Sequence, residues 1–197
     1  HEAMIALARH YRQAMRARFI GITGSNGKTT PKELTFHLLE AVEANVYRSP
    51  GNLNNLYGVP LTLFRAPSDS RIAVLEMGIS TETEMARLAE IVEPDVVAIT
   101  NVSATHLEFL GTVEAVAQAK LDLVRGSRPS VPAIINVDDP VLTKEAAKIR
   151  QKYVTFGLGE ELFGIEVTRA REILDLVPVT KVPQMPDYML GVINLRG

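Results

Sequence analysis

Apolar residues follow two patterns along the chain. Short apolar runs rich in Val and Ile predict buried strands, whereas longer segments with an apolar residue at about every third or fourth position predict helices. Strands are expected at residues 18–23, 45–48, 71–77, 96–100, 132–137 and 152–156. Helices are expected at residues 29–44, 82–92, 113–125 and 140–150. A loop and a helix, bent or interrupted at Pro60, are expected at residues 52–64.

The first residues carry an amphipathic pattern of their own. Met4, Ala8, Tyr11 and Met15 fall on one helical face, with arginines between them. Arginine-rich segments of this kind can be transit peptides. We favour a short helix at residues 1–17 that packs on the domain and leads into the first strand.

The order of the predicted elements defines the fold class. Strands that alternate with helices indicate an α/β protein with a mostly parallel sheet covered by helices on both faces. In such sheets, ligands bind at the carboxyl ends of the strands. Glu76, Asn136 and the segment 101–106 lie at the ends of predicted strands, so we expect them at the ligand-binding edge.

A glycine-rich turn joins the first sheet strand to the next helix. It consists of Gly24, Ser25, Asn26, Gly27, Lys28, Thr29 and Thr30. A strand, a glycine turn and a helix N-terminus aim backbone N–H groups at an anion, and glycine permits the tight curl. Lys28 adds a positive charge for terminal phosphates, and Thr29 offers a hydroxyl to a phosphate-bound Mg²⁺. The Lys-Thr pair favours a nucleotide-triphosphate site of P-loop type over an ordinary glycine-rich turn.

Two residues near predicted strand ends are candidate metal ligands. Glu76 ends a buried strand, where a carboxylate suits Mg²⁺, and a surface salt bridge is the alternative. His106 lies in the polar loop after the strand at residues 96–100. The residues alone leave a hydrogen-bonding role and a ligand role for His106 equally open.

Other polar residues have a structural interpretation beside a functional one. Lys120 lies within a predicted helix, and by itself it is expected to be solvated. Asn52, Asn54 and Asn55 either cap the next helix or bind polar groups of a substrate. Asn136 begins a turn whose Asp residues would cap the helix at residues 140–150.

The composition narrows the class of protein. A chain of 197 residues with 46% apolar residues is large enough for a globular domain with a real core. Its net charge of −2 gives no reason to expect nucleic acid as a partner. The absence of cysteine excludes disulfides, thiolate catalysis and cysteine-based zinc sites. No apolar run approaches the length of a membrane span, and we expect a cytoplasmic location.

Together the motifs resemble the central domain of the Mur ligases, ATP-dependent enzymes that form amide bonds in peptidoglycan synthesis. The likeness is to the type that adds D-alanyl-D-alanine to a UDP-N-acetylmuramoyl-tripeptide. It spans residues 18–157 and is carried, in the family's order, by RFIGITGSNGKTT, GNLNNLYGVPLTL, VLEMG, PDVVAITNVSATHLE, AQAK and INVDDP.

The resemblance implies ATP and Mg²⁺ as cofactors and a UDP-muramoyl-peptide-type substrate. It implies that Lys28 binds phosphate and that Thr29 and Glu76 serve Mg²⁺. The implied reaction activates a carboxylate as an acyl phosphate, which an amine then attacks. Stabilising a transferring phosphate by lysine and Mg²⁺ is what this step requires physically.

Three further roles rest on the resemblance alone. His106 would help to hold a second metal, and Lys120 matches a lysine that is carbamylated in the family and then acts as an acidic metal ligand. Asn136 matches a residue near the adenine. The resemblance thus implies that Lys28, His106 and Lys120 take part in catalysis.

The family's N-terminal domain for the UDP-sugar and its C-terminal domain that closes over ATP have no counterpart in this sequence. We therefore expect an incomplete ligase, because positioning two substrates is a large part of the rate. A folylpolyglutamate-synthase-like ligase is an alternative with a related phosphate-binding loop. The sequences GNLNN and THLE fit the Mur type better.

The character of the sequence changes near residue 158. A strand is predicted at residues 161–167, and residues 158–197 resemble the first part of a CheW-like domain up to its GVINLRG signature. CheW-like domains are adaptors that link chemoreceptors to a histidine kinase in chemotaxis. We favour a chimera of a domain at residues 1–157 and a short β-rich segment at residues 158–197 that binds a protein partner. The alternative is a natural chain whose divergent tail only imitates the CheW pattern. A non-catalytic scaffold is accordingly the alternative function.

Overall fold

The structure is a computed structural model of the full chain. It describes all residues except 106, 129–130, 150–152, 159–160 and 167–197. The chain divides into two compact units, His1–Arg150 and Gln151–Gly197, and each is described by itself.

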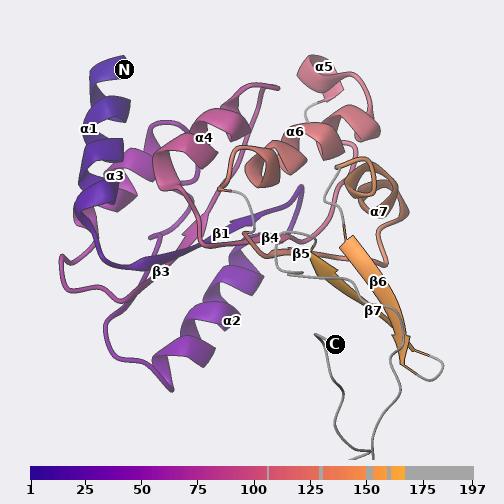
Figure 1. Ribbon diagram of the computed structural model, residues 1–197. Coiled ribbons are helices and arrows are strands. Elements are labelled where there is room, and N and C mark those ends of the chain that lie inside the picture. Colours follow the sequence, from indigo (N-terminus) through magenta and orange to yellow (C-terminus); the bar gives the residue numbers. More distant parts are fainter. Residues whose placement is uncertain (106, 129–130, 150–152, 159–160, 167–197) are drawn as a thin grey trace, which may run out of the picture. The chain divides into compact units, whose positions relative to one another are not determined.

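A parallel sheet of five strands forms the centre of the first unit (Figure 1). In spatial order its strands are β2 (Val46–Arg48), β3 (Ile72–Glu76), β1 (Arg18–Thr23), β4 (Val96–Ile99) and β5 (Ala133–Ile135). Every neighbouring pair is parallel, which confirms the predicted sheet. Because β1 is central, with β3 and β4 on either side, the loop after β1 lies where ligands bind in such sheets.

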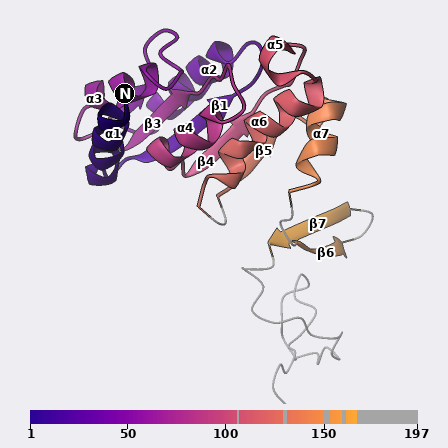
Figure 2. The same cartoon turned by 90° about the horizontal axis from the view of Figure 1, so that it is seen from above.

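Helices pack against both faces of this sheet. They are α1 (Glu2–Ala14), α2 (Thr29–Glu40), α3 (Gly58–Arg65), α4 (Glu84–Val92), α5 (Leu107–Leu110), α6 (Val113–Arg125) and α7 (Pro140–Ala146). Figure 1 shows α2 on one face of the sheet and α4 and α6 on the other. Seen from above, α1, α4 and α6 follow one another across that second face (Figure 2). The predicted α/β class is confirmed.

The apolar residues predicted for the strands and for α4 and α6 form the core. Phe19 of β1, Leu75 of β3, Leu88 of α4 and Leu123 of α6 are completely buried. Burying such a side chain contributes about 1.5–3 kcal/mol, so this layer supplies much of the stability of the unit. In contrast, α2 leaves Leu38 largely exposed.

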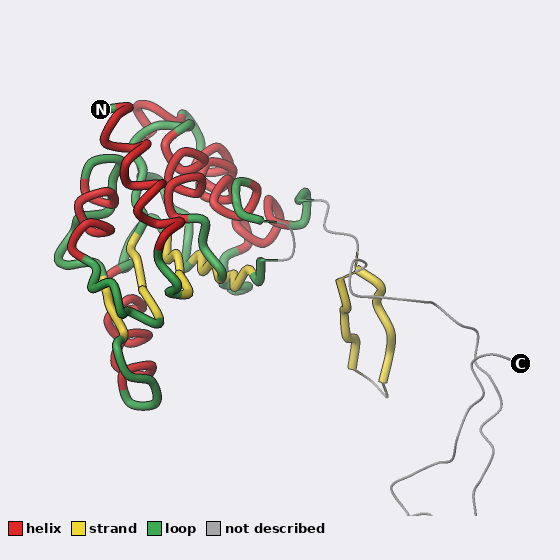
Figure 3. The backbone as a smooth tube through the Cα atoms, turned by 60° about the vertical axis from the view of Figure 1, so that its left-hand side comes forward, coloured by secondary structure: helices red, strands yellow, loops and turns green. Residues whose placement is uncertain are grey.

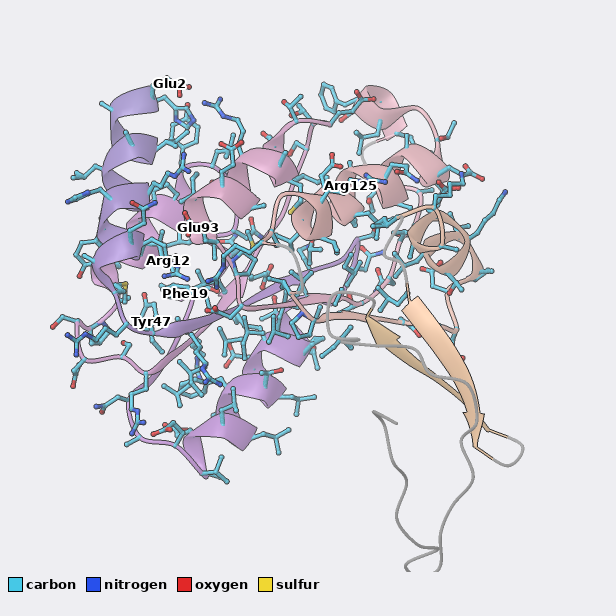
Figure 4. All side chains as sticks on the ribbon, viewed as in Figure 1. Glu2, Arg12, Phe19, Tyr47, Glu93 and Arg125 are labelled. Atoms are coloured by element: carbon cyan, nitrogen blue, oxygen red, sulfur yellow. The ribbon has the colours of Figure 1, made fainter. Side chains whose placement is uncertain are left out.

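The predicted helix at the start of the chain is confirmed as α1, and a buried arginine anchors it. The guanidinium of Arg12 lies 3.9 Å from the centre of the Phe19 ring and donates a hydrogen bond of 2.9 Å to the carbonyl oxygen of Glu93 (Figure 4). It also donates to the carbonyl of Val92 and lies 3.7 Å from the carboxylate of Asp95. Burial lowers the pKa of Arg12, and the charge of Asp95 opposes that shift.

Several helices differ from their predicted bounds; the helix predicted at residues 140–150, for example, ends at Ala146. The predicted helix at residues 29–44 ends at Glu40, and Asn45 then takes a left-handed conformation, with φ of 59°, as the chain turns into β2. The predicted bend at Pro60 is wrong. The helix begins only at Gly58, so Pro60 lies in its first turn, where its missing N–H removes no helical hydrogen bond.

The second unit contains an antiparallel pair of strands, β6 (Tyr153–Leu158) and β7 (Glu161–Glu166), drawn in yellow in Figure 3. The strand predicted at residues 152–156 therefore pairs with β7 and does not extend the parallel sheet. Most of the CheW-like stretch, residues 167–197, lies outside the described residues.

Candidate functional site

The phosphate loop (residues 24–30) runs from the end of β1 into the first turn of α2 and needs glycine at two positions. Gly27 has φ of +67°, in the left-handed region that favours glycine. A Cβ on Gly24 would lie 2.0 Å from the hydroxyl oxygen of Thr100, so the loop approaches the end of β4 too closely for a side chain. The predicted reason for these glycines, a backbone curled where a Cβ would either collide or forbid the dihedral angles, agrees with this geometry, with a collision at Gly24 and a left-handed φ at Gly27.

Asn101, which follows β4, holds the first half of the phosphate loop. Its side-chain oxygen accepts hydrogen bonds from the amides of Ser25 (3.1 Å) and Asn26 (3.0 Å), and its side-chain nitrogen donates to the carbonyl of Asn26 (2.9 Å). The Ser25 hydroxyl accepts from the amide of Ser103 and the hydroxyl of Thr105. The predicted site residues Ser25 and Asn26 therefore bond to the segment after β4.

The second half of the phosphate loop presents unpaired donors. In the part of the chain that the structure describes, no protein group accepts a hydrogen bond from the amides of residues 27–30. The first amides of a helix have no partner within the helix, and they favour an anion. This arrangement fits the prediction that Gly27, Lys28, Thr29 and Thr30 bind phosphate.

Two lysines meet at the same carbonyl group. The ammonium groups of Lys28 and Lys120 each donate a hydrogen bond of 3.1 Å to the carbonyl oxygen of Gly24. Lys120 is only 2% exposed, whereas the sequence by itself suggested a solvated lysine. Burial and, to a smaller extent, the positive charge of Lys28 together lower the pKa of Lys120 to about 8.

These lysines line a cavity of about 170 Å³. Its walls are Gly24, Ser25, Lys28, Asn54, Asn55, Gly78, Ile79, Ser80 and Lys120. Two larger hollows lie elsewhere, one at the amino ends of β1 and β3 and one between α1 and α4. Neither contains the phosphate loop, and ligands of parallel sheets bind at the carboxyl ends, so we assign the site to the smaller cavity.

Glu76 ends β3 as a buried carboxylate, only 3% exposed, with polar partners on both oxygens. One oxygen accepts a hydrogen bond of 3.0 Å from the Thr29 hydroxyl, and the other accepts one of 2.9 Å from the Asn54 side chain. The ammonium of Lys32 lies 4.0 Å from the first oxygen. The structure thus brings together two of the predicted metal-binding residues, Thr29 and Glu76.

Lys32 is a part of this site that the sequence did not indicate. It is 1% exposed, and its ammonium donates to the carbonyl oxygens of Ser49 (3.0 Å) and Gly51 (3.2 Å). It therefore ties α2 to the Asn-rich loop (residues 51–55) and to the end of β3. A lysine next to a glutamate on a predicted helix carries no signal that would distinguish it from a surface residue.

The predicted substrate residues have different positions. Asn54 contacts Glu76 and lines the cavity. Asn55 also lines the cavity, but its side-chain oxygen accepts hydrogen bonds from the amide groups at the start of α3, as the helix-capping alternative predicted. Asn52 is exposed and is not part of the cavity wall.

Of the two remaining predicted residues, only Asn136 is described, and it does not join this cluster. Asn136 is exposed after β5, and its side-chain oxygen accepts from the amide of Asp138 within its own turn. Asp139 caps α7, as the structural interpretation of this turn predicted. His106 lies outside the described residues. Within the described ranges there is no group of three or more His, Cys, Asp or Glu side chains that could hold a metal ion.

The fold and the site define an α/β protein with a phosphate loop of P-loop type at the carboxyl edge of a parallel sheet. Residues 22–180 match the sequence model of the Mur ligase middle domain. The chain therefore belongs to the Mur ligase family, which confirms the resemblance found in the motifs. This match runs past residue 157, the predicted end of the domain.

Known proteins of this family are similar over most of the chain. It is 39% identical over 157 residues to the UDP-N-acetylmuramoyl-tripeptide--D-alanyl-D-alanine ligase of Bacillus subtilis, covering 80% of this chain and 34% of that ligase. The crystal structure of MurF ligase from Thermotoga maritima in complex with ADP matches with a TM-score of 0.69 and 30% identity, covering 84% of this chain and 44% of that one.

Another solved structure shares the fold at lower identity. The structure of E. coli FolC in complex with DHPP and ADP matches with a TM-score of 0.57 and 16% identity, covering 92% of this chain and 54% of that one. This likeness shows the fold alone.

The chain spans about a third of the length of the curated ligase from Bacillus subtilis. In the part of the chain that the structure describes, no helix is long and apolar enough to cross a membrane.

Proposed function

We propose that this chain is the nucleotide-binding part of an ATP- and Mg²⁺-dependent ligase that forms an amide bond in peptidoglycan precursor synthesis. In the proposed reaction a substrate carboxylate is activated as an acyl phosphate, and an amine then displaces the phosphate. One observation carries the proposal: Lys28 and Lys120 line the same cavity beside the free amides of residues 27–30.

The charges in the cavity support the binding of a triphosphate. The amides of residues 27–30 and the ammonium of Lys28 supply donors without an acidic residue in the cavity wall. Preorganised donors of this kind stabilise the charge that develops on a transferring phosphate, and they need no reorganisation during the reaction. Lys28 therefore has the role of a phosphate-binding and catalytic residue in this proposal.

The residues at the end of β3 fit Mg²⁺. Thr29 and Glu76 offer hard oxygen donors 3.0 Å apart at the N-terminus of α2, and these are the groups that would hold the ion. Bound there, Mg²⁺ would neutralise charge on the phosphates. Lys32 and Asn54 keep the Glu76 carboxylate oriented without it. His106, at the end of the segment after β4, is proposed as a ligand of a second metal.

Lys120 is proposed as the residue that becomes carbamylated. With a pKa of about 8, a large part of its amine is neutral at mildly alkaline pH. A neutral amine adds to CO₂ and loses a proton, which gives a carbamate anion in place of an ammonium cation. The change would replace the repulsion between Lys28 and Lys120 by attraction.

The muramoyl-peptide substrate belongs to the same proposal. Asn54 and Asn55 in the cavity wall offer amide groups to polar parts of a substrate, whereas Asn52 would have to contact it from outside the cavity. Asn136 is proposed to lie near the adenine. The name of the ligase from Bacillus subtilis suggests that D-alanyl-D-alanine is the incoming amine. A cytoplasmic location belongs with these substrates.

Calorimetric titration with ATP and Mg²⁺ tests the proposal. We expect the wild-type chain to bind and Lys28→Ala to lose most of the binding heat, because the phosphate-binding ammonium is lost. Lys144→Ala is the matched control, since Lys144 is exposed on α7, away from the cavity. Equal heats from the wild type and Lys28→Ala would remove the nucleotide-binding role.

The remaining interpretations of the sequence stay proposals. A folylpolyglutamate-synthase-like activity is supported only by the fold of FolC, while GNLNN and THLE favour the Mur type. A chimera with a domain boundary at residues 157 and 158, and a CheW-like tail that binds a protein, rest on the sequence likeness alone. Limited proteolysis that cleaves between residues 157 and 161 and leaves the preceding part intact would support that boundary.

A further inference from the structure

The two halves of the phosphate loop differ in what their amides bind. The amides of Ser25 and Asn26 donate to the side-chain oxygen of Asn101, whereas those of residues 27–30 have no acceptor in the described part of the chain. Gly27, with φ of +67°, is the point at which the backbone turns between the two halves. Only the second half is therefore open to phosphate.

The Asn101 side chain does not occupy the place of the ligand. It is not part of the wall of the cavity that Lys28 and Lys120 line. Its backbone is fixed as well, because its carbonyl oxygen accepts a hydrogen bond of 3.0 Å from the Ser25 amide. The preceding residue, Thr100, bonds through its amide to the carbonyl of Thr23 at 3.0 Å. A nucleotide that enters the cavity has no need to displace Asn101.

We propose that Asn101 is a positioning residue for nucleotide binding: it holds the first half of the phosphate loop to the end of β4, so that the amides of residues 27–30 are preorganised for phosphate. This inference rests on the proposed nucleotide-binding function. The first half of the phosphate loop is thus held by Asn101, and the second half, residues 27–30, binds the ligand.

The role requires the carboxamide of asparagine. The side-chain oxygen accepts two hydrogen bonds, and the side-chain nitrogen donates one of 2.9 Å to the carbonyl of Asn26. Aspartate would keep the acceptors, but it would lose that donor and place a negative charge beside the phosphates. Alanine would leave both amides without this acceptor.

Titration of the full chain with ATP and Mg²⁺ tests the effect on binding. We expect Asn101→Ala to weaken ATP binding by about ten- to a hundredfold, since the three hydrogen bonds between this side chain and the loop are lost. Ser103→Ala is the matched control. It removes only the acceptor of the Asn26 side chain, and we expect a change of less than about threefold. Asn101→Asp should also bind weakly, and this loss should shrink as salt is added, because salt screens the repulsion.

Amide hydrogen exchange without nucleotide tests the loop itself. In the wild type and in Asn101→Asp the Ser25 and Asn26 amides should exchange slowly, while in Asn101→Ala the Asn26 amide should exchange at least about tenfold faster with the β1 amides unchanged. Slow Asn26 exchange in Asn101→Ala, or ATP binding by that variant as tight as wild type or tighter, overturns the inference. A wild-type chain that does not bind ATP removes the proposed function, and this inference with it, whereas normal wild-type binding with unchanged Asn101→Ala binding removes the inference alone.

Discussion

The buried ammonium of Lys120 makes the stability of this protein depend on pH in a way that one substitution can reveal. Lys120 is 2% exposed on α6, and its pKa falls from 10.5 to about 8 in the folded chain. The unfolded chain therefore binds more protons between these two values. The free energy of unfolding must therefore rise with pH across that window. The destabilisation caused by burying the charged Lys120 ammonium is fully present below about pH 8.

The size of the effect follows from the shift. A fall from 10.5 to about 8 corresponds to about 3 kcal/mol, because each unit is about 1.4 kcal/mol. Lys120→Met removes the titrating group and keeps most of the apolar stem. We therefore expect the unfolding free energy of the wild type, relative to Lys120→Met, to increase by about 3 kcal/mol between about pH 7 and about pH 10.5.

Urea unfolding across this pH range, in buffers free of CO₂, is the measurement. Both proteins share the other titrating groups, so their contributions cancel in the difference between the two unfolding free energies. Excluding CO₂ prevents carbamylation of Lys120 from adding a second equilibrium. Lys144→Met serves as the control, since an exposed lysine should give a difference that does not change with pH. A wild-type minus Lys120→Met difference that stays constant within about 0.5 kcal/mol would show that the Lys120 amine is not desolvated as the structure indicates.

Three further substitutions test the loop, the anchored first helix and a helix cap. Gly24→Ala should abolish ATP binding, because its Cβ would lie 2.0 Å from the Thr100 hydroxyl oxygen, and adding Thr100→Ala should restore part of the affinity measured by calorimetry. Arg12→Ala should lower the unfolding free energy in urea by about 2–4 kcal/mol, since it removes the stacking on Phe19 and leaves two buried carbonyls without their donor. Thr112→Ala removes the side-chain acceptor of the first turn of α6 and should cost about 1 kcal/mol, measured as a lower melting temperature.

The sequence predicted which residues share an edge of the sheet but only some of their contacts. The order of strands and helices was enough to place Glu76 and the phosphate loop together, because the carboxyl ends of parallel strands meet at one edge. Asp139 was predicted as a helix cap from local pattern alone, and the structure confirms it. Local rules succeed where the partner lies within a few residues.

The long-range pairs could not be predicted, because they depend on how loops close over one another. Asn101 meets the phosphate loop from 75 residues away, and Lys32 meets the carbonyl of Gly51 across the gap between α2 and the Asn-rich loop. The helical pattern of α2 predicts its apolar positions, yet Lys32 is buried while Leu38 is 72% exposed. The apolar pattern of α2 therefore did not indicate that Lys32 is a buried part of the site.

The burial of Lys32 is explained by its partners. An isolated buried ammonium is strongly unfavourable, and it persists only where acceptors and negative charge surround it. Here two carbonyl oxygens lie within hydrogen-bonding distance, and carboxylate oxygens of Glu33 and Glu76 lie at 3.1 Å and 4.0 Å. The same ammonium that is stabilised by Glu76 also holds the Asn-rich loop in place. The ammonium of Lys32 therefore positions both Glu76, the proposed metal ligand, and the Asn-rich loop. If either of them moved away, this buried ammonium would lose one of its partners.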